Sequence, residues 1–102
     1  MRICVSIIES NIEGALASAK RALRAGADLL EIRFDHMNEL PRDLSPFRTI
    51  PAPKIATLRP VDHGGKWNGD EDGRLSFLKR AMEHFQMLLL PTAGSSSNCV
   101  DA

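Results

Sequence analysis

Three short apolar runs are separated by a helical pattern and by polar segments along the chain. Residues 3–8 and 29–34 are almost continuously apolar, as expected of strands that are covered on both faces. A third run of this kind covers 54–59. Between the first two runs, apolar residues recur at helical spacing over 12–23, and Gly26 is a typical C-terminal stop signal. The pattern therefore predicts repeated strand–helix units.

The ends of the helices also carry local signals. Ser10 and Glu13 have the spacing of a capping box, which predicts that Ser10 caps the first helix. Prolines limit any helix in the following connection to a short one near 41–47. A longer helix is expected over 70–85, with an apolar stripe facing the core. That stripe consists of Leu75, Leu78, Met82 and Phe85.

The spacing of the strands indicates the fold class. Strands start near Arg2, Asp28 and Lys54, a step of about 26 residues, and repeated βα units build a parallel sheet. A (β/α)8 barrel averages about 31 residues per unit. No Gly-x-Gly-x-x-Gly turn follows the first strand, which favours the barrel over a doubly wound sheet. We therefore expect an α/β chain, the N-terminal three to four βα units of an incomplete (β/α)8 TIM barrel.

The end of the chain has a different composition. The partial barrel is expected over residues 1–85, with a further short strand at 87–90 if a fourth unit begins there. The segment 92–98 is rich in small polar residues, which is typical of low-complexity sequence. Residues 86–102 are therefore predicted to form a divergent, disordered tail.

Composition excludes several classes of protein. With 13 basic and 13 acidic residues among 102, nothing indicates a nucleic-acid or acidic-lipid partner. The apolar runs are too short to span a membrane, and no cleavage-site pattern follows the first, so a cytoplasmic location is expected. Cys4 is expected to be a core residue without a disulfide, and the Cys and His residues show no metal-ligand spacing.

Charged residues interrupt the second strand at a spacing of two. Glu31, Arg33 and Asp35 therefore share one face of that strand. Functional groups of a barrel lie at the carboxyl ends of its strands, which is where Glu31, Arg33, Arg59 and Ser6 are expected. Two guanidinium groups and a carboxylate suit a small hydroxylated acid. An internal salt bridge from Glu31 to Arg33 or Arg59 explains the same residues equally well.

Three segments together resemble type I 3-dehydroquinate dehydratase. They are residues 2–7, residues 26–35, and Thr57-Leu58-Arg59-Pro60 followed by Gly64-Gly65-Lys66, and the resemblance runs from about residue 2 to about 84. It implies a (β/α)8 barrel and a lyase of the shikimate pathway, which leads to chorismate and the aromatic amino acids.

The resemblance also implies a reaction and a substrate site. The family dehydrates 3-dehydroquinate to 3-dehydroshikimate through a Schiff base on a lysine, with a histidine as general acid and base and without a metal or other cofactor. The expected substrate-binding residues are Ser6, Glu31, Arg33 and Arg59.

Two departures from the family leave the activity of this chain open. The family's catalytic histidine and lysine lie on later strands, so no catalytic residue is assigned and the chain by itself is expected to be inactive. His63 stands where the family has a glutamate before Gly-Gly. The alternative is a non-catalytic half-barrel that pairs with a partner, or with itself, through open sheet edges. The resemblance also allows a family-like homodimer.

Overall fold

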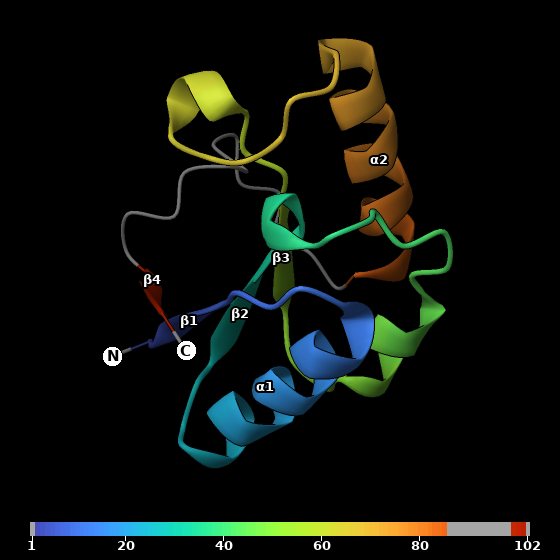
Figure 1. Cartoon of the computed structure of the whole chain (residues 1–102). Helices are drawn as coiled ribbons and strands as arrows, with labels where there is room; N and C mark the ends of the chain where they lie inside the picture. The colour runs from blue at the N-terminus through green and yellow to red at the C-terminus, as the bar shows by residue number, and fades with distance from the viewer. Residues whose placement is uncertain (1, 86–98, 102) are drawn as a thin grey trace.

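A parallel β-sheet and two α-helices make up the fold (Figure 1). The computed structural model describes residues 2–85 and, for their backbone, 99–101. Its elements are the strands β1 (Cys4–Ile7), β2 (Leu29–Arg33), β3 (Lys54–Thr57) and β4 (Cys99–Asp101), the helices α1 (Ile12–Arg24) and α2 (Glu71–His84), and the 3₁₀ helices η1 (Phe34–His36), η2 (Ser45–Thr49) and η3 (Val61–His63).

The strands lie in the spatial order β3-β2-β1-β4, and each neighbouring pair is parallel. The three predicted strands and the two longer predicted helices are thereby confirmed. The result is a small α/β unit whose first three strands are joined by crossovers, consistent with part of a TIM-barrel-like architecture. In Figure 1, α1 lies along one end of the sheet and α2 stands beside β3.

The two faces of the sheet differ in polarity. The strand register aligns Ile7 with Ile32 and Ile32 with Ala56, so these side chains share one face. All three are buried in a core that also contains buried residues of α1 and α2. Ser6 and Glu31 are likewise aligned and lie on the opposite face. The helices therefore cover the apolar face, and the other face carries polar groups.

The cap of α1 lies one residue later than predicted. Asn11, rather than Ser10, has the extended backbone of an N-cap, and its Oδ1 accepts a hydrogen bond from the Gly14 N–H at 2.7 Å. The Ser10 carbonyl instead accepts the N–H of Asn38 at 2.9 Å, which ties the start of α1 to the segment after β2. That long-range bond explains why the local capping-box signal was misleading.

The predicted buried stripe of α2 is only half correct. Phe85 is buried and Leu78 is partly buried, but Leu75 and Met82 are 47% and 42% exposed. The helix is rotated so that Phe77 faces the core instead.

The aromatic side chains explain this rotation of α2. The ring of Phe77 meets the ring of Phe34 edge-on, with centroids 4.8 Å apart, and Ala81 lies one turn further along the same buried face. An aromatic ring removes more apolar surface from water than a leucine side chain does. Burial of Phe77 therefore outweighs burial of Leu75.

The connection between β2 and β3 contains η2 rather than a helix at 41–47. Pro46 lies in the first turn of η2, where its missing N–H costs no hydrogen bond. The Asp43 carboxylate accepts the N–H of Ser45 at 3.0 Å and so supports the start of this turn. A short helix was thus predicted in the right connection, but a few residues too early.

The described part of the predicted tail is a strand. Cys99–Asp101 forms β4 and pairs in parallel with β1, with Cys4 aligned to Cys99. Cys4 is buried as predicted, but it is disulfide-bonded in the structure, so the expectation of no disulfide at this residue was wrong. The strand predicted at 87–90 lies outside the described residues.

Lys54 is buried at the amino end of β3, the end far from the polar groups described below. Its Nζ donates to the carbonyl oxygens of Ile50 and Ala52 at 2.8 and 2.9 Å, and burial lowers the pKa of this amine. The lysine thus closes the turn that leads into β3. Neither α1 nor α2, the α-helices within the described residues, has the length and apolar character needed to cross a membrane.

Candidate functional site

A buried carboxylate joins three strands near their carboxyl ends. Glu31 of β2 is 1% exposed, and each of its oxygens accepts a hydrogen bond from a described residue. Ser6 Oγ of β1 donates to Oε1 at 2.5 Å, and Thr57 Oγ1 of β3 donates to Oε2 at 2.8 Å. Glu31 therefore cross-links β1, β2 and β3 on the face opposite the helices.

A second buried carboxylate orients an arginine at the end of β2. Arg33 Nε donates to Asp35 Oδ1 at 3.0 Å, and Arg33 Nη2 donates to Asp35 Oδ2 at 2.8 Å. The backbone N–H of Lys66 also donates to Oδ2, at 3.1 Å, and His36 Nε2 lies 3.9 Å from the same oxygen. A bidentate pair of this kind fixes the plane of the guanidinium group.

The 60–67 loop between β3 and α2 closes on the backbone of Arg59. The N–H of Trp67 donates to the Arg59 carbonyl at 3.0 Å, and the N–H of Gly65 donates to the Pro60 carbonyl at 2.9 Å. A Cβ on Gly65 would stand 2.0 Å from the Arg59 carbonyl oxygen, so a side chain there is sterically excluded. Since Lys66 in this loop also contacts Asp35, the loop is held at two points.

The structure connects the four predicted binding residues through two carboxylates. Ser6 and Glu31 contact each other directly. Arg33 is paired with Asp35, and that carboxylate holds the loop that closes on Arg59. Arg33 therefore forms its ion pair with Asp35. The internal salt bridge considered from the sequence was a different one, from Glu31 to Arg33 or Arg59.

Two residues of the site were not among the predicted binding residues. Thr57 lies two residues before Arg59, and Asp35 lies two residues after Arg33. The two-residue spacing was the available signal, because such residues share a face of a strand. We use the name rim cluster for Ser6, Glu31, Arg33, Asp35, Thr57 and Arg59.

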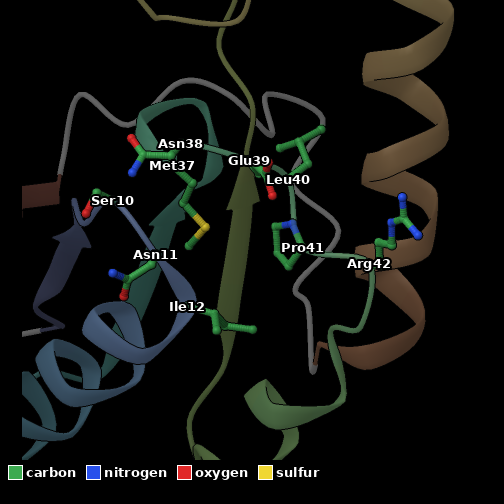
Figure 2. Close-up of a pocket in the computed structure, with 9 residues that line it drawn as sticks. All are labelled: Ser10, Asn11, Ile12, Met37, Asn38, Glu39, Leu40, Pro41 and Arg42. Atoms are coloured by element: carbon green, nitrogen blue, oxygen red, sulfur yellow. The ribbon is translucent and has the colours of Figure 1, made fainter.

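A separate hollow of about 520 Å³ lies between the start of α1 and residues 37–42 (Figure 2). No member of the rim cluster lines it. Two of its polar groups already serve the local structure: the Asn11 side chain caps α1, and the Ser10 carbonyl accepts the N–H of Asn38. The rim cluster, rather than this hollow, is therefore the candidate site.

The chemistry available to the rim cluster is that of charged donors and acceptors. Arginine presents several N–H donors in a fixed fork, which suits carboxylate and hydroxyl oxygens. Among the described residues, His, Cys, Asp and Glu side chains form no group of three that could hold a metal ion.

The electrostatics of Asp35 lead to a pH-dependent prediction. Burial raises the pKa of this carboxyl, but the hydrogen bonds and charge of Arg33 and the N–H of Lys66 outweigh burial and hold the pKa below its ordinary value. The carboxyl thus binds its proton less tightly in the folded chain than in the unfolded chain. Its contribution to stability is complete above about pH 4 and is lost as the pH falls through the lowered pKa.

We therefore expect the free energy of unfolding to fall as the pH is lowered from about 4 through the lowered pKa of Asp35, and to fall less steeply in Asp35→Asn. Urea unfolding at a series of pH values, followed by circular dichroism, measures both slopes. Asp62→Asn is the matched control, because Asp62 is an exposed carboxylate in the 60–67 loop. Equal slopes in the wild-type chain and in Asp35→Asn would contradict the prediction.

Comparisons with known proteins show which family the chain is similar to. A family model described as type I 3-dehydroquinase matches residues 3–90. A 3-dehydroquinate dehydratase of Methanococcus vannielii is 41% identical over 83 residues, which are 80% of this chain and 37% of the relative. One from Methanothermobacter thermautotrophicus is 39% identical over 90 residues, covering 80% of this chain and 38% of the relative.

A plant relative has the same region within a longer chain. The bifunctional 3-dehydroquinate dehydratase/shikimate dehydrogenase of Arabidopsis thaliana is 35% identical over 85 residues, 79% of this chain and 14% of that protein. The matched region of this chain thus spans less than two fifths of each of these three relatives. It includes β1, β2, β3 and the whole rim cluster. The chain belongs to the type I 3-dehydroquinase family.

Proposed function

We propose that the rim cluster is the substrate-holding part of a 3-dehydroquinate dehydratase site. The reaction removes water from 3-dehydroquinate to form 3-dehydroshikimate, through a Schiff base on a lysine. The observation that carries the proposal is the buried Glu31 carboxylate, held by Ser6 and Thr57 at the carboxyl ends of adjacent parallel strands. The curated relatives, which are named for this activity, support it.

The proposal assigns different roles to the charged groups. Both oxygens of Glu31 already accept a hydroxyl, and the side chain is buried, so Glu31 suits the orientation of a neighbouring base better than primary contact with substrate. Arg33 and Arg59 are proposed to donate to substrate oxygens, because guanidinium groups recognise carboxylates and hydroxyls with directed N–H bonds.

The proposal places the Schiff-base lysine and the acid/base histidine on later strands of a (β/α)8 barrel, of which β1, β2 and β3 are the N-terminal part. Lys54 does not suit the nucleophile's role, since it is buried at the opposite end of β3 and bonded to two carbonyls. Lys66 is exposed in the 60–67 loop. We therefore infer that residues 1–102 by themselves bind substrate weakly and do not turn it over.

Substitution of Arg59 tests the substrate-holding role. In Arg59→Ala, the affinity for 3-dehydroquinate is expected to fall about 10- to 150-fold, the loss that follows when a hydrogen bond to a charged group, about 1.5–3 kcal/mol, is removed. Isothermal titration calorimetry on the 102-residue chain measures this affinity. Arg24→Ala is the matched control, because Arg24 is exposed in the last turn of α1. Equal losses in both variants would contradict the assignment.

Trapping with borohydride tests the assignment of the covalent step. Borohydride reduces a Schiff base to a stable amine, so intact mass after incubation with 3-dehydroquinate shows whether a lysine has reacted. No adduct together with measurable binding supports the proposal. An adduct on Lys66 would show that this chain carries its own nucleophile.

The second candidate, a self-associating module, is favoured by one observation. Among the described residues, β3 is an end strand of the sheet and pairs with β2 alone. End strands offer unpaired backbone groups to another chain. Sedimentation velocity over a range of concentrations distinguishes the two candidates. A defined oligomer that does not bind 3-dehydroquinate would support the self-associating module. A family-like homodimer that binds 3-dehydroquinate would support the substrate-holding role of the rim cluster.

A further inference from the structure

The Asp35 carboxylate connects two parts of the rim that are distant in sequence. Its side chain is fully buried, and it receives both Arg33 bonds from β2. It also receives the N–H of Lys66, 31 residues further along the chain. Beyond Lys66, the same loop closes on the Arg59 carbonyl through Trp67. One carboxylate therefore links the guanidinium of Arg33 to the loop that defines the position of Arg59.

We propose that Asp35 is a positioning residue of the substrate site, one that holds Arg33 and the Arg59 loop in a fixed mutual arrangement. This inference rests on the function proposed above. Asp35 acts through the two arginines and needs no contact with substrate. Its two oxygens have different partners: Oδ1 accepts from Arg33 Nε, whereas Oδ2 accepts from Arg33 Nη2 and from the Lys66 N–H of the loop.

A role in stability alone explains this arrangement less well. The cost of removing two charges from water offsets most of their attraction, so a buried ion pair adds little net stability. An apolar contact could hold the loop to β2 at least as firmly. An apolar contact could not fix the plane of a guanidinium group, whereas a bidentate carboxylate does so. His36 Nε2 lies 3.9 Å from Oδ2 and adds a positive charge beside this carboxylate only when it is protonated.

The test compares Asp35→Asn with Asp62→Asn, which removes an exposed carboxylate from the 60–67 loop. Calorimetry with 3-dehydroquinate is expected to show at least tenfold weaker binding for Asp35→Asn and less than twofold change for Asp62→Asn. In an Arg33→Ala background, Asp35→Asn is expected to weaken binding by a smaller factor than in the wild-type background, because the guanidinium that it orients is gone and only its bond to the loop remains. Hydrogen exchange at the Lys66 amide is expected to accelerate in Asp35→Asn.

The outcomes separate this inference from the proposed function. A wild-type chain that does not bind 3-dehydroquinate overturns both. Wild-type binding with unchanged affinity in Asp35→Asn overturns the positioning role alone, as does an effect of the same size with and without Arg33. If Asp35→Asn does not fold, Asp35→Glu replaces it: the longer side chain keeps the charge but tilts the guanidinium. Weaker binding at an unchanged melting temperature then supports the role, and wild-type affinity overturns it.

Discussion

Replacement of Phe34 by alanine is expected to lower the free energy of unfolding by about 3–5 kcal/mol. Phe34 is fully buried, and its ring contacts those of Phe47, Phe77 and Phe85 at centroid distances of 5.6, 4.8 and 6.0 Å. Alanine would lose the transfer energy of the ring and leave a cavity between η2 and α2. The free energy of unfolding of a small domain is only about 5–15 kcal/mol, so this single change would leave much of the chain unfolded at moderate temperature.

Urea unfolding monitored by circular dichroism measures the loss. Leu75→Ala is the control on α2, because Leu75 is 47% exposed, and its expected change is within about 0.5 kcal/mol. The loss of unfolding free energy in Phe34→Leu should lie between those of Phe34→Ala and Leu75→Ala, because the leucine side chain fills part of the cavity. A loss below about 1 kcal/mol in Phe34→Ala would show that the ring cluster is not the centre of the core.

Replacement of Gly65 by alanine is expected to cause the largest change at the site itself. The new Cβ would stand 2.0 Å from the Arg59 carbonyl oxygen and 2.5 Å from its carbon, so the backbone of the loop must move. Such overpacking costs about 1–3 kcal/mol and sometimes more. The movement separates Gly65 from Pro60, and it shifts both Lys66 and Arg59. We expect the affinity for 3-dehydroquinate to fall at least tenfold, while the helix-side core stays folded.

The neighbouring glycine supplies the control. Gly64 has a φ of +85°, but a Cβ there meets nothing within 4 Å, so Gly64→Ala introduces backbone strain without a clash. Calorimetry with 3-dehydroquinate and thermal melting of both variants separate the two effects. If Gly65→Ala binds substrate as tightly as the wild-type chain, the closed loop is not needed to place Arg59.

Local patterns predicted the polar site only in part. The shared face of Glu31, Arg33 and Asp35 followed from the alternation of side chains along a strand, and Ser6 was placed by its position near the carboxyl end of the first strand. The partners of these residues did not follow, because partner choice depends on register between strands. Thr57 donates to Glu31 from a strand 26 residues away in sequence, and the identity of that donor is set by the alignment of β2 with β3.

The boundaries and orientations of the elements were likewise decided partly by local sequence patterns and partly by contacts in the folded chain. The apolar runs were sufficient to place β1, β2 and β3, because a buried strand needs apolar residues whatever surrounds it. The choice of Asn11 as the cap of α1 depended on Asn38, which occupies the carbonyl of Ser10. The rotation of α2 depended on Phe34, because its ring makes an edge-on contact with the ring of Phe77.

Apolar periodicity and the places of β1, β2 and β3 along the chain were thus properties of the sequence itself, since backbone geometry imposes periods of two and 3.6 on any sequence. The face that α2 buries, the pairing of Arg33 with Asp35 and the attachment of the 60–67 loop to β2 required the folded molecule. The α2 face and the loop attachment join residues that are far apart in sequence, and the two-residue spacing of Arg33 and Asp35 did not by itself decide that they pair. Their energies come from contacts that exist only after the strands have aligned.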